Sequence, residues 1–419
     1  MRAAPRRTFA TRAGPWHLPP AMPTPPADLT PLPSLYAVGD FRDGWPPAEG
    51  PDEGAADYEW RWCRTNPAAL TADKIEAARR ELRVVGGYME RLPLACVRHG
   101  LVDYAEKWHY WRPAGHGPSG VEQPPLFGWR SFHLRDQRAP FRSEDMLAFL
   151  RARGAPHILC AYGLGVHADV LDACARSLKV YYSIDAPPLR VPPEVAGRFD
   201  LILVGCERQR EEVRARHPEV PCEVLPIGPE FADPETFRPL PGVRKEYDLV
   251  YVAAAQPYKR HDILFDALAR CRRKVRALCV FGYGELGDAL RAEARARGLD
   301  VDFVGPPGVS YAEVNALVNR ARVGVVCGVD DGCPAVLTEY MLAGLPVLAN
   351  ARLRCGLDYV TPETGMAAEP ERFHEKIEEA LDRLGSFRPR EHALARWTWP
   401  HSVRRFAAAL EGLGWRRPG

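Results

Sequence analysis

The chain has 419 residues, which is enough for two or three domains at roughly 150 residues per domain, so a single small module is excluded. Its 56 Lys and Arg residues nearly balance 54 Asp and Glu residues, and the net charge of +2 excludes a global field that gathers nucleic acid or anionic membranes. The eleven Cys residues show no Cys-x-x-Cys spacing. The mean hydropathy is -0.29, and every apolar run is interrupted by charged residues, Gly or Pro. We therefore predict a cytoplasmic protein without a disulfide framework, zinc site or transmembrane helix, at most in peripheral contact with a membrane.

The amino-terminal part, residues 1–75, is predicted to be an extension. Its first 35 residues are rich in Pro and Arg and lack the apolar stretch of a signal peptide, so we expect disorder there. An Arg-rich, acid-poor start is also typical of transit peptides, although prolines oppose their amphipathic helix, and translation from Met22 is a further alternative. Residues 36–75 mix Trp, Gly and acidic residues without a clear period and are interpreted as an appended segment.

From about residue 76 onward, short apolar runs alternate with helical patterns, which is typical of βαβ units in a parallel sheet. The predicted strands are 82–85, 157–162, 179–184 and 201–205, then 247–253, 277–282, 301–305, 323–327 and 346–350. A Pro-rich turn at 237–242 separates the two groups. We therefore predict an α/β protein of two doubly wound domains, 76–240 and 241–397, with a ligand in the cleft at the carboxyl ends of the strands.

The segment 323–350 shows the order strand, loop, helix, strand. Pro334 suits a first helical turn, residues 335–343 form the predicted helix, and Gly344 ends it. The loop 330–333 therefore brings the free N–H groups of a helix start to the cleft, where they can bind an anion.

Two carboxylates, Asp331 and Glu339, stand eight residues apart in this segment. With Gly332 and Pro334 they resemble the "EGxPxxxxE" signature of the group 1, retaining glycosyltransferases of the GT-B fold, with Asp in place of the first Glu. The resemblance implies that Glu339 accepts hydrogen bonds from the ribose of a nucleotide-sugar and that Asp331 meets the transferred sugar. It assigns donor binding also to Gly332, Cys333, Pro334 and Ala335. The alternative is a solvated loop acid and a helix-face acid without a ligand.

A second match lies in residues 248–268, which are similar to the opening strand and loop of the family's donor domain. The resemblance places Lys259 against the donor diphosphate. The family usually has an Arg five residues earlier, where this chain has Ala254, and the adjacent Arg260 is the candidate substitute. An exposed loop lysine is the alternative for Lys259.

A Gly-x-Gly turn follows the strand 277–282 and includes Gly284. It is formally part of a dinucleotide fingerprint, but Asp302 falls inside the next strand rather than beyond it, so the similar turn of the glycosyltransferase donor domain is preferred. Asp300 and Asp302 imitate an Asp-x-Asp metal motif but are interpreted as a helix-to-strand connection. No metal is predicted.

The amino-terminal half resembles the family's acceptor domain more loosely. Gly87 lies in a predicted turn that approaches phosphate or acceptor, or is a plain tight turn. Residues 224–240 resemble the family's interdomain linker, with Gly228 and Phe237 in register. The helix 398–415 resembles the terminal helix that crosses back to the first domain.

Many relatives place a His near the reacting centre where this chain has Ile184. Asp185 is the nearest polar candidate for a catalytic role beside the acceptor, or it is a turn acid. His157, His167 and His261 are assigned to structure.

These matches predict transfer of a sugar from a nucleotide diphosphate donor to an acceptor, with retention and without a metal or other cofactor. Lys259, Asp331 and Asp185 are the catalytic candidates. The acceptor classes left open are a carbohydrate, a lipid-linked molecule and a small molecule. The alternative functions are a non-catalytic or weakly active nucleotide-sugar-binding protein and a sugar-nucleotide epimerase.

Overall fold

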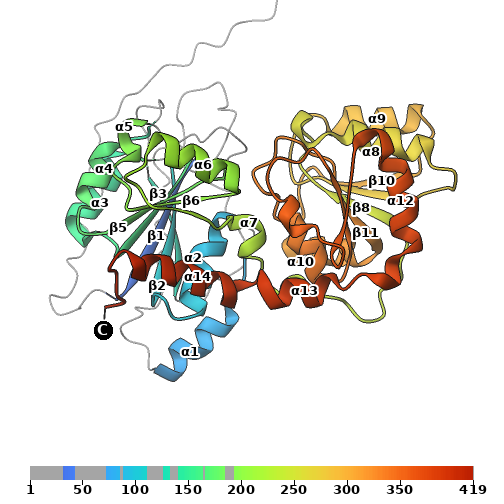
Figure 1. The fold of residues 1–419 in the computed structure, drawn as a ribbon. Helices are drawn as coiled ribbons and strands as arrows, with labels where there is room; N and C mark the ends of the chain where they lie inside the picture. The colour runs from blue at the N-terminus through green and yellow to red at the C-terminus, as the bar shows by residue number, and fades with distance from the viewer. Residues whose placement is uncertain are drawn as a thin grey trace, which may run out of the picture. The chain divides into compact units, whose positions relative to one another are not determined.

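Two parallel β-sheets organise the chain in the computed structural model (Figure 1). The structure describes residues 32–42, 72–84, 88–110, 126–132, 140–163, 166–184 and 193–418. These residues belong to one compact unit, Pro31–Gly419. No helix among them combines the length and the hydropathy needed to cross a bilayer.

The N-terminal sheet has the strand order β3-β2-β1-β4-β5-β6-β7. Its strands are β1 Ser34–Arg42, β2 Tyr104–Tyr110, β3 Phe127–Phe132, β4 Ile158–Tyr162, β5 Leu178–Tyr182, β6 Leu201–Val204 and β7 Cys222–Val224. Its helices are α1 Ala72–Glu81, α2 Arg91–Arg98, α3 Glu144–Arg153, α4 Ala168–Ala173, α5 Pro193–Ala196, α6 Glu207–Arg216 and α7 Ile227–Glu230. Apolar side chains of α3, α4 and α6 fill the core on one face, and α2 fills the other together with α14 (Trp399–Gly412), the last helix of the chain (Figure 1).

The C-terminal sheet has the strand order β10-β9-β8-β11-β12-β13. Its strands are β8 Tyr247–Val252, β9 Ala277–Val280, β10 Val301–Val304, β11 Ala321–Val326, β12 Val347–Asn350 and β13 Gly365–Ala368. Its helices are α8 His261–Arg270, α9 Gly287–Ala296, α10 Tyr311–Asn319, α11 Val336–Leu342, α12 Phe373–Asp382 and α13 Pro389–Arg396. Helices α8, α9 and α12 pack on one face and α10, α11 and α13 on the other, so both sheets are doubly wound, as predicted.

The predicted strand at 82–85 is wrong. Residues 82–84 follow α1 without strand pairing, and residue 85 lies outside the described residues. Leu82 and Val84 are nevertheless buried in the core beneath the N-terminal sheet. The apolar run therefore indicated burial correctly, but not the type of element that is buried.

The prediction of an extension over residues 1–75 is wrong for residues 34–42. Strand β1 lies inside the N-terminal sheet, where Leu35 pairs with Ala105 of β2 on one side and with Ile158 of β4 on the other. Because a Pro-rich stretch precedes this short apolar run and no helical pattern follows it directly, the run lacks the context of a βαβ unit. Met22 and residues 43–71 lie outside the described residues.

A buried ion pair links the edge strand β3 to its neighbour β2. Arg130 donates from Nη2 to Glu106 Oε1 at 2.6 Å and from Nε to Oε2 at 2.7 Å. The side chains of Arg130 and Glu106 are 4% and 3% exposed, and Tyr104 and Trp108 also donate to Glu106. This network compensates the charges that interrupt the apolar pattern of both strands.

Replacing Arg130 by Met should therefore lower the free energy of unfolding by about 3–5 kcal/mol, because the Glu106 carboxylate stays buried without its cation. Urea unfolding followed by tryptophan fluorescence measures the change. The double variant R130M/E106Q should recover much of the loss. If the single variant R130M were as stable as the wild type, this account of the ion pair would be contradicted.

Candidate active site

Three turns meet at the carboxyl ends of β8, β9 and β11. Two backbone hydrogen bonds join the first two turns: Ala255 N donates to Tyr283 O at 2.7 Å, and Leu286 N donates to Ala255 O at 2.9 Å. Gly284 has a φ of +121°, and a Cβ on it would lie 2.4 Å from Ala255 O. The predicted donor-site residue Gly284 is therefore required for the close approach of these two turns.

The structure brings together two of the predicted catalytic residues. Lys259, at the end of a short 3-10 helix after β8, forms an ion pair from Nζ with Asp331 Oδ2 in the loop after β11. The two side chains are 15% and 11% exposed. Tyr251 OH donates to the carbonyl oxygen of Lys259 at 2.5 Å. A lysine at the carboxyl end of a parallel sheet can form a charge-assisted hydrogen bond with an anion.

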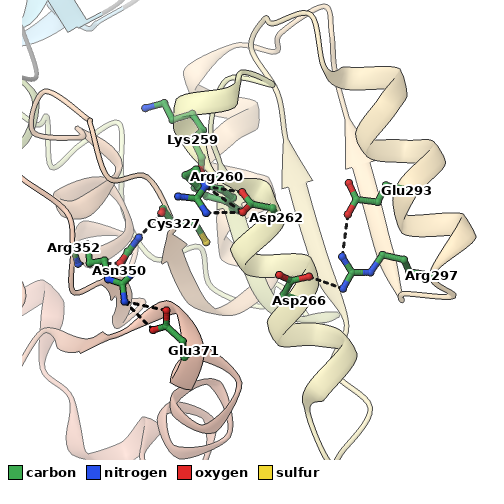
Figure 2. Close-up of polar contacts among 11 residues, drawn as sticks. Lys259, Arg260, Asp262, Asp266, Glu293, Arg297, Cys327, Asn350, Arg352 and Glu371 are labelled. Carbon is green, nitrogen blue, oxygen red and sulfur yellow. Dashed lines mark hydrogen bonds and ion pairs between the residues drawn. The ribbon is translucent and has the colours of Figure 1, made fainter.

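Arg260 has different partners from Lys259. Its guanidinium donates to Asp262 at 2.7 Å and 2.9 Å, and its backbone has a φ of +53° at the start of α8. Figure 2 shows Lys259 extending away from this pair. Ala254 is buried and carries no cation. The contacts described for Arg260 therefore do not support its predicted role as the substitute for an Arg at position 254.

The start of the loop after β11 is held by the neighbouring strand. Asn350, the last residue of β12, donates from Nδ2 to the carbonyl oxygen of Cys327 at 2.9 Å (Figure 2). Further along, Arg354 forms an ion pair with Asp330 at 2.8 Å. Both contacts fix the course of the loop on which Asp331 stands.

The second half of the loop runs from Gly332 through Pro334 into α11, whose N-cap is Ala335. Cys333 is buried and has a φ of +63°. A Cβ on Gly228 of the linker would lie 2.8 Å from Cys333 O and 3.0 Å from Ala335 N. The linker backbone therefore packs directly on this loop. An anion site at this helix start stays a prediction.

Glu339, on α11, is paired with a residue that the sequence analysis missed. Arg91 donates from Nη2 to Glu339 Oε1 and from Nη1 to Gly228 O at 2.7 Å, and the side chains of Arg91 and Glu339 are 1% and 6% exposed. Burial alone would lower the pKa of Arg91, but Glu339 and Tyr311 outweigh burial and raise it. The one available signal was a basic residue directly before the apolar run 92–97.

Two thiols were also missed. Cys206, the residue before α6, and Cys355, in the segment after β12, have their Sγ atoms 3.1 Å apart. This hydrogen bond lowers the pKa of the Cys206 thiol and raises that of Cys355. Single cysteines 149 residues apart give no sequence signal for such a contact.

The histidines have the structural surroundings expected for them. His157 Nδ1 accepts from the backbone N–H of Ser34 at 3.1 Å, and His167 caps α4. His261 is buried between the rings of Tyr251 and Phe281, with centroid distances of 4.8 Å and 5.3 Å. Among the described residues neither of its ring nitrogens has a hydrogen-bond partner.

Two predicted site residues, Gly87 and Asp185, lie outside the described residues. Asp302, in strand β10, forms an ion pair with Arg276 at 2.8 Å and accepts a hydrogen bond from Tyr247 OH. The described ranges contain no group of three His, Cys, Asp or Glu residues arranged to hold a metal ion.

In the comparison with known proteins, the match to a protein family covers the part of the chain that contains the C-terminal sheet. Residues 233–396 match the family model for group 1 glycosyl transferases. Among solved structures, Anabaena HepE in complex with UDP and glucose has a TM-score of 0.60 and 18% identity, over 79% of this chain and 98% of HepE. Sucrose-phosphate synthase from Thermosynechococcus elongatus has a TM-score of 0.59 and 16% identity, over 78% and 94% of the two chains.

The pneumococcal O-GlcNAc transferase GtfA in complex with UDP and GlcNAc has a TM-score of 0.51 and 13% identity, over 64% of this chain and 59% of GtfA. The comparison with curated proteins found no match. The fold is that of the GT-B proteins. Residues 233–396 are thus similar to group 1 glycosyl transferases, and the solved structures show a shared fold.

The burial of His261 makes the stability of the fold depend on pH. Burial, and then the charge of Lys259, lower the pKa of His261 from 6.5 to about 4. The unfolded chain therefore binds a proton that the folded chain rejects, and stability should fall as the pH decreases from about 6.5 through about 4, by on the order of 3 kcal/mol.

In H261F, a ring of similar shape should pack between Tyr251 and Phe281 without this proton. The difference in unfolding free energy between H261F and the wild type, measured in urea at pH 7, 5 and 4, should shift in favour of H261F toward acid pH. H217Q, at a partly exposed position after α6, serves as the control. A difference independent of pH would contradict the account.

Proposed function

We propose that the protein transfers a sugar from a nucleoside diphosphate sugar to an acceptor hydroxyl, with retention at the anomeric carbon and without a metal ion. The bond between the anomeric carbon and the diphosphate breaks, a bond to the acceptor oxygen forms on the same face, and the acceptor proton is released. The observation that carries the proposal is the Lys259–Asp331 pair at the strand ends of a matched glycosyltransferase domain.

Lys259 supplies the positive charge in this proposal. A unit charge about 4 Å from a phosphate contributes about 4 kcal/mol at an effective dielectric constant of about 20. Its ammonium group is already held at the sheet edge by Asp331, so a bound diphosphate takes over part of that interaction. Asp331 then accepts a hydrogen bond from a hydroxyl of the transferred sugar. The developing diphosphate charge is stabilised without movement of either strand.

Glu339 binds the ribose in this proposal, since a carboxylate accepts hydrogen bonds from two adjacent hydroxyls at roughly 1.5–3 kcal/mol each. Arg91 holds the carboxylate oxygen Oε1 and thereby fixes the direction of the carboxylate. We therefore assign Arg91 as a positioning residue rather than a catalytic one. UDP is the proposed nucleotide, because HepE and GtfA were solved with UDP.

The proposal includes a cytoplasmic location. All ten cysteines among the described residues are free thiols, including the pair Cys206 and Cys355, although their sulfurs lie only 3.1 Å apart. Free thiols in such number are typical of proteins from a reducing compartment.

A second candidate function is nucleotide-sugar binding with slow turnover or none. The observation in its favour is the missing cation: Ala254 stands where the family resemblance expects Arg, and the described contacts of Arg260 are with Asp262. Release of UDP from UDP-glucose, with or without an acceptor, separates the two functions. Isomerised donor in the absence of an acceptor would instead indicate an epimerase.

The K259A variant should lower kcat/KM for UDP release on the order of 10²-fold or more, because the departing diphosphate loses the cation that the proposal assigns to it. The matched control is K274A, since Lys274 is 82% exposed and pairs with Asp300 just before β10. Circular dichroism verifies the fold of both variants. Unchanged turnover in K259A would remove this lysine from the active site.

Retention and metal independence have their own test. The glucose released from UDP-glucose should first appear as the α anomer, observed by NMR before mutarotation. EDTA should leave the rate unchanged. Initial release of the β anomer, or a rate lost in EDTA and restored by Mn²⁺ or Mg²⁺, would contradict these two parts of the proposal.

A further inference from the structure

Two exposed tyrosines flank the Lys259–Asp331 pair. Tyr258, in the 3-10 helix that also carries Lys259, is 38% exposed, and Tyr283, in the turn after β9, is 61% exposed. Within the described ranges, the exposed large hydrophobic side chains are these two and Leu394. The two phenol groups lie close enough for each to affect the pKa of the other. A solvent-facing aromatic pair beside a charged site is typical of a recognition surface.

The backbone holds this tyrosine pair in place. Tyr283 is fixed by the hydrogen bond that its carbonyl oxygen accepts from Ala255 N, and Gly284 permits the contact of the two turns. A Cβ on Gly328, in the loop after β11, would lie 3.3 Å from the carbonyl oxygen of Tyr258. The turn that carries Tyr258 therefore packs closely against this loop. The backbone positions that carry both rings are therefore fixed before any ligand binds, which reduces the entropy lost on binding.

The charged groups near Tyr258 and Tyr283 indicate which end of the proposed site the two tyrosines occupy. Partial burial is the main cause that raises the pKa of Tyr258 and Tyr283, and the carboxylate of Asp331 contributes to both shifts. The charge of Glu339 instead contributes to the raised pKa of Tyr311. The pair thus lies near Asp331, the proposed sugar end, whereas Glu339 marks the proposed ribose end.

The distance to the proposed phosphate-binding group is also short. Lys259 Nζ lies 4.8 Å from the centroid of the Tyr258 ring. A group attached to a diphosphate at Lys259 therefore comes within reach of the ring. On the Asp331 side of the diphosphate, that group is the sugar.

We propose that Tyr258 and Tyr283 form a stacking platform for the pyranose ring of the sugar that the donor nucleotide carries. This inference rests on the proposed function, because it takes the position of the diphosphate from Lys259. The apolar C–H face of a pyranose packs on an aromatic face, while its hydroxyls remain free for Asp331 and water. The platform selects for a ring with an unhindered apolar face and so contributes to donor specificity.

Calorimetry with UDP, UDP-glucose and UDP-GlcNAc tests the platform. In Y283A, the Kd for UDP should stay within about twofold of the wild type. The Kd for whichever of the two UDP-sugars the wild type binds more tightly should rise about five- to tenfold. Y283F keeps the ring and should retain most of the sugar-dependent affinity. L394A, which removes another exposed apolar side chain, should change neither Kd.

Each contrary result has one meaning. Equal losses for UDP and UDP-sugars in Y283A would assign the ring to the nucleoside and overturn the platform. No loss for any ligand would make the tyrosines plain surface residues and overturn it as well. A wild-type protein that binds neither UDP nor the UDP-sugars would instead contradict the proposed function, and with it the inference.

Discussion

The ion pair between Lys259 and Asp331 connects the turn after β8 with the loop after β11, and the rest of the site is arranged around it. The turn after β9 is held against the same region by backbone hydrogen bonds that the close approach at Gly284 allows. Neighbouring parallel strands end at one edge of the sheet, so short turns are enough to bring these groups together. The proposed donor site is therefore formed at the carboxyl ends of several strands rather than by any single loop.

The second ion pair shows how the site tolerates a buried acid. Glu339 would be costly to bury alone, and Arg91 compensates its charge while also donating to the backbone of Gly228. Each carboxylate that the family resemblance assigns to donor binding is thus already paired with a cation. In the proposed complex the two pairs differ: a diphosphate would compete with Asp331 for Lys259, whereas ribose hydroxyls would add to Glu339 while Arg91 stays bound.

The sequence was most informative where the signal is local. The C-terminal strands are apolar runs bounded by Gly and Pro, and Lys259, Asp331 and Glu339 stand at recognisable places in strand-loop-helix units. The sequence did not show which charged residues, distant along the chain, compensate each other's charge. Glu106 and Arg130 interrupt β2 and β3 with charge, and only the fold shows that the charges cancel. In the same way, Arg91 meets Glu339 across 248 residues of sequence, so no local pattern could reveal the pair.

The most direct test of the central claim is a crystal structure of the protein with UDP. The account predicts the diphosphate within hydrogen-bond distance of Lys259 Nζ, the ribose hydroxyls on Glu339, and Arg91 still bound to the Glu339 carboxylate. A nucleotide bound at another edge of the fold, or a diphosphate remote from Lys259 with the Lys259–Asp331 pair undisturbed, would contradict it.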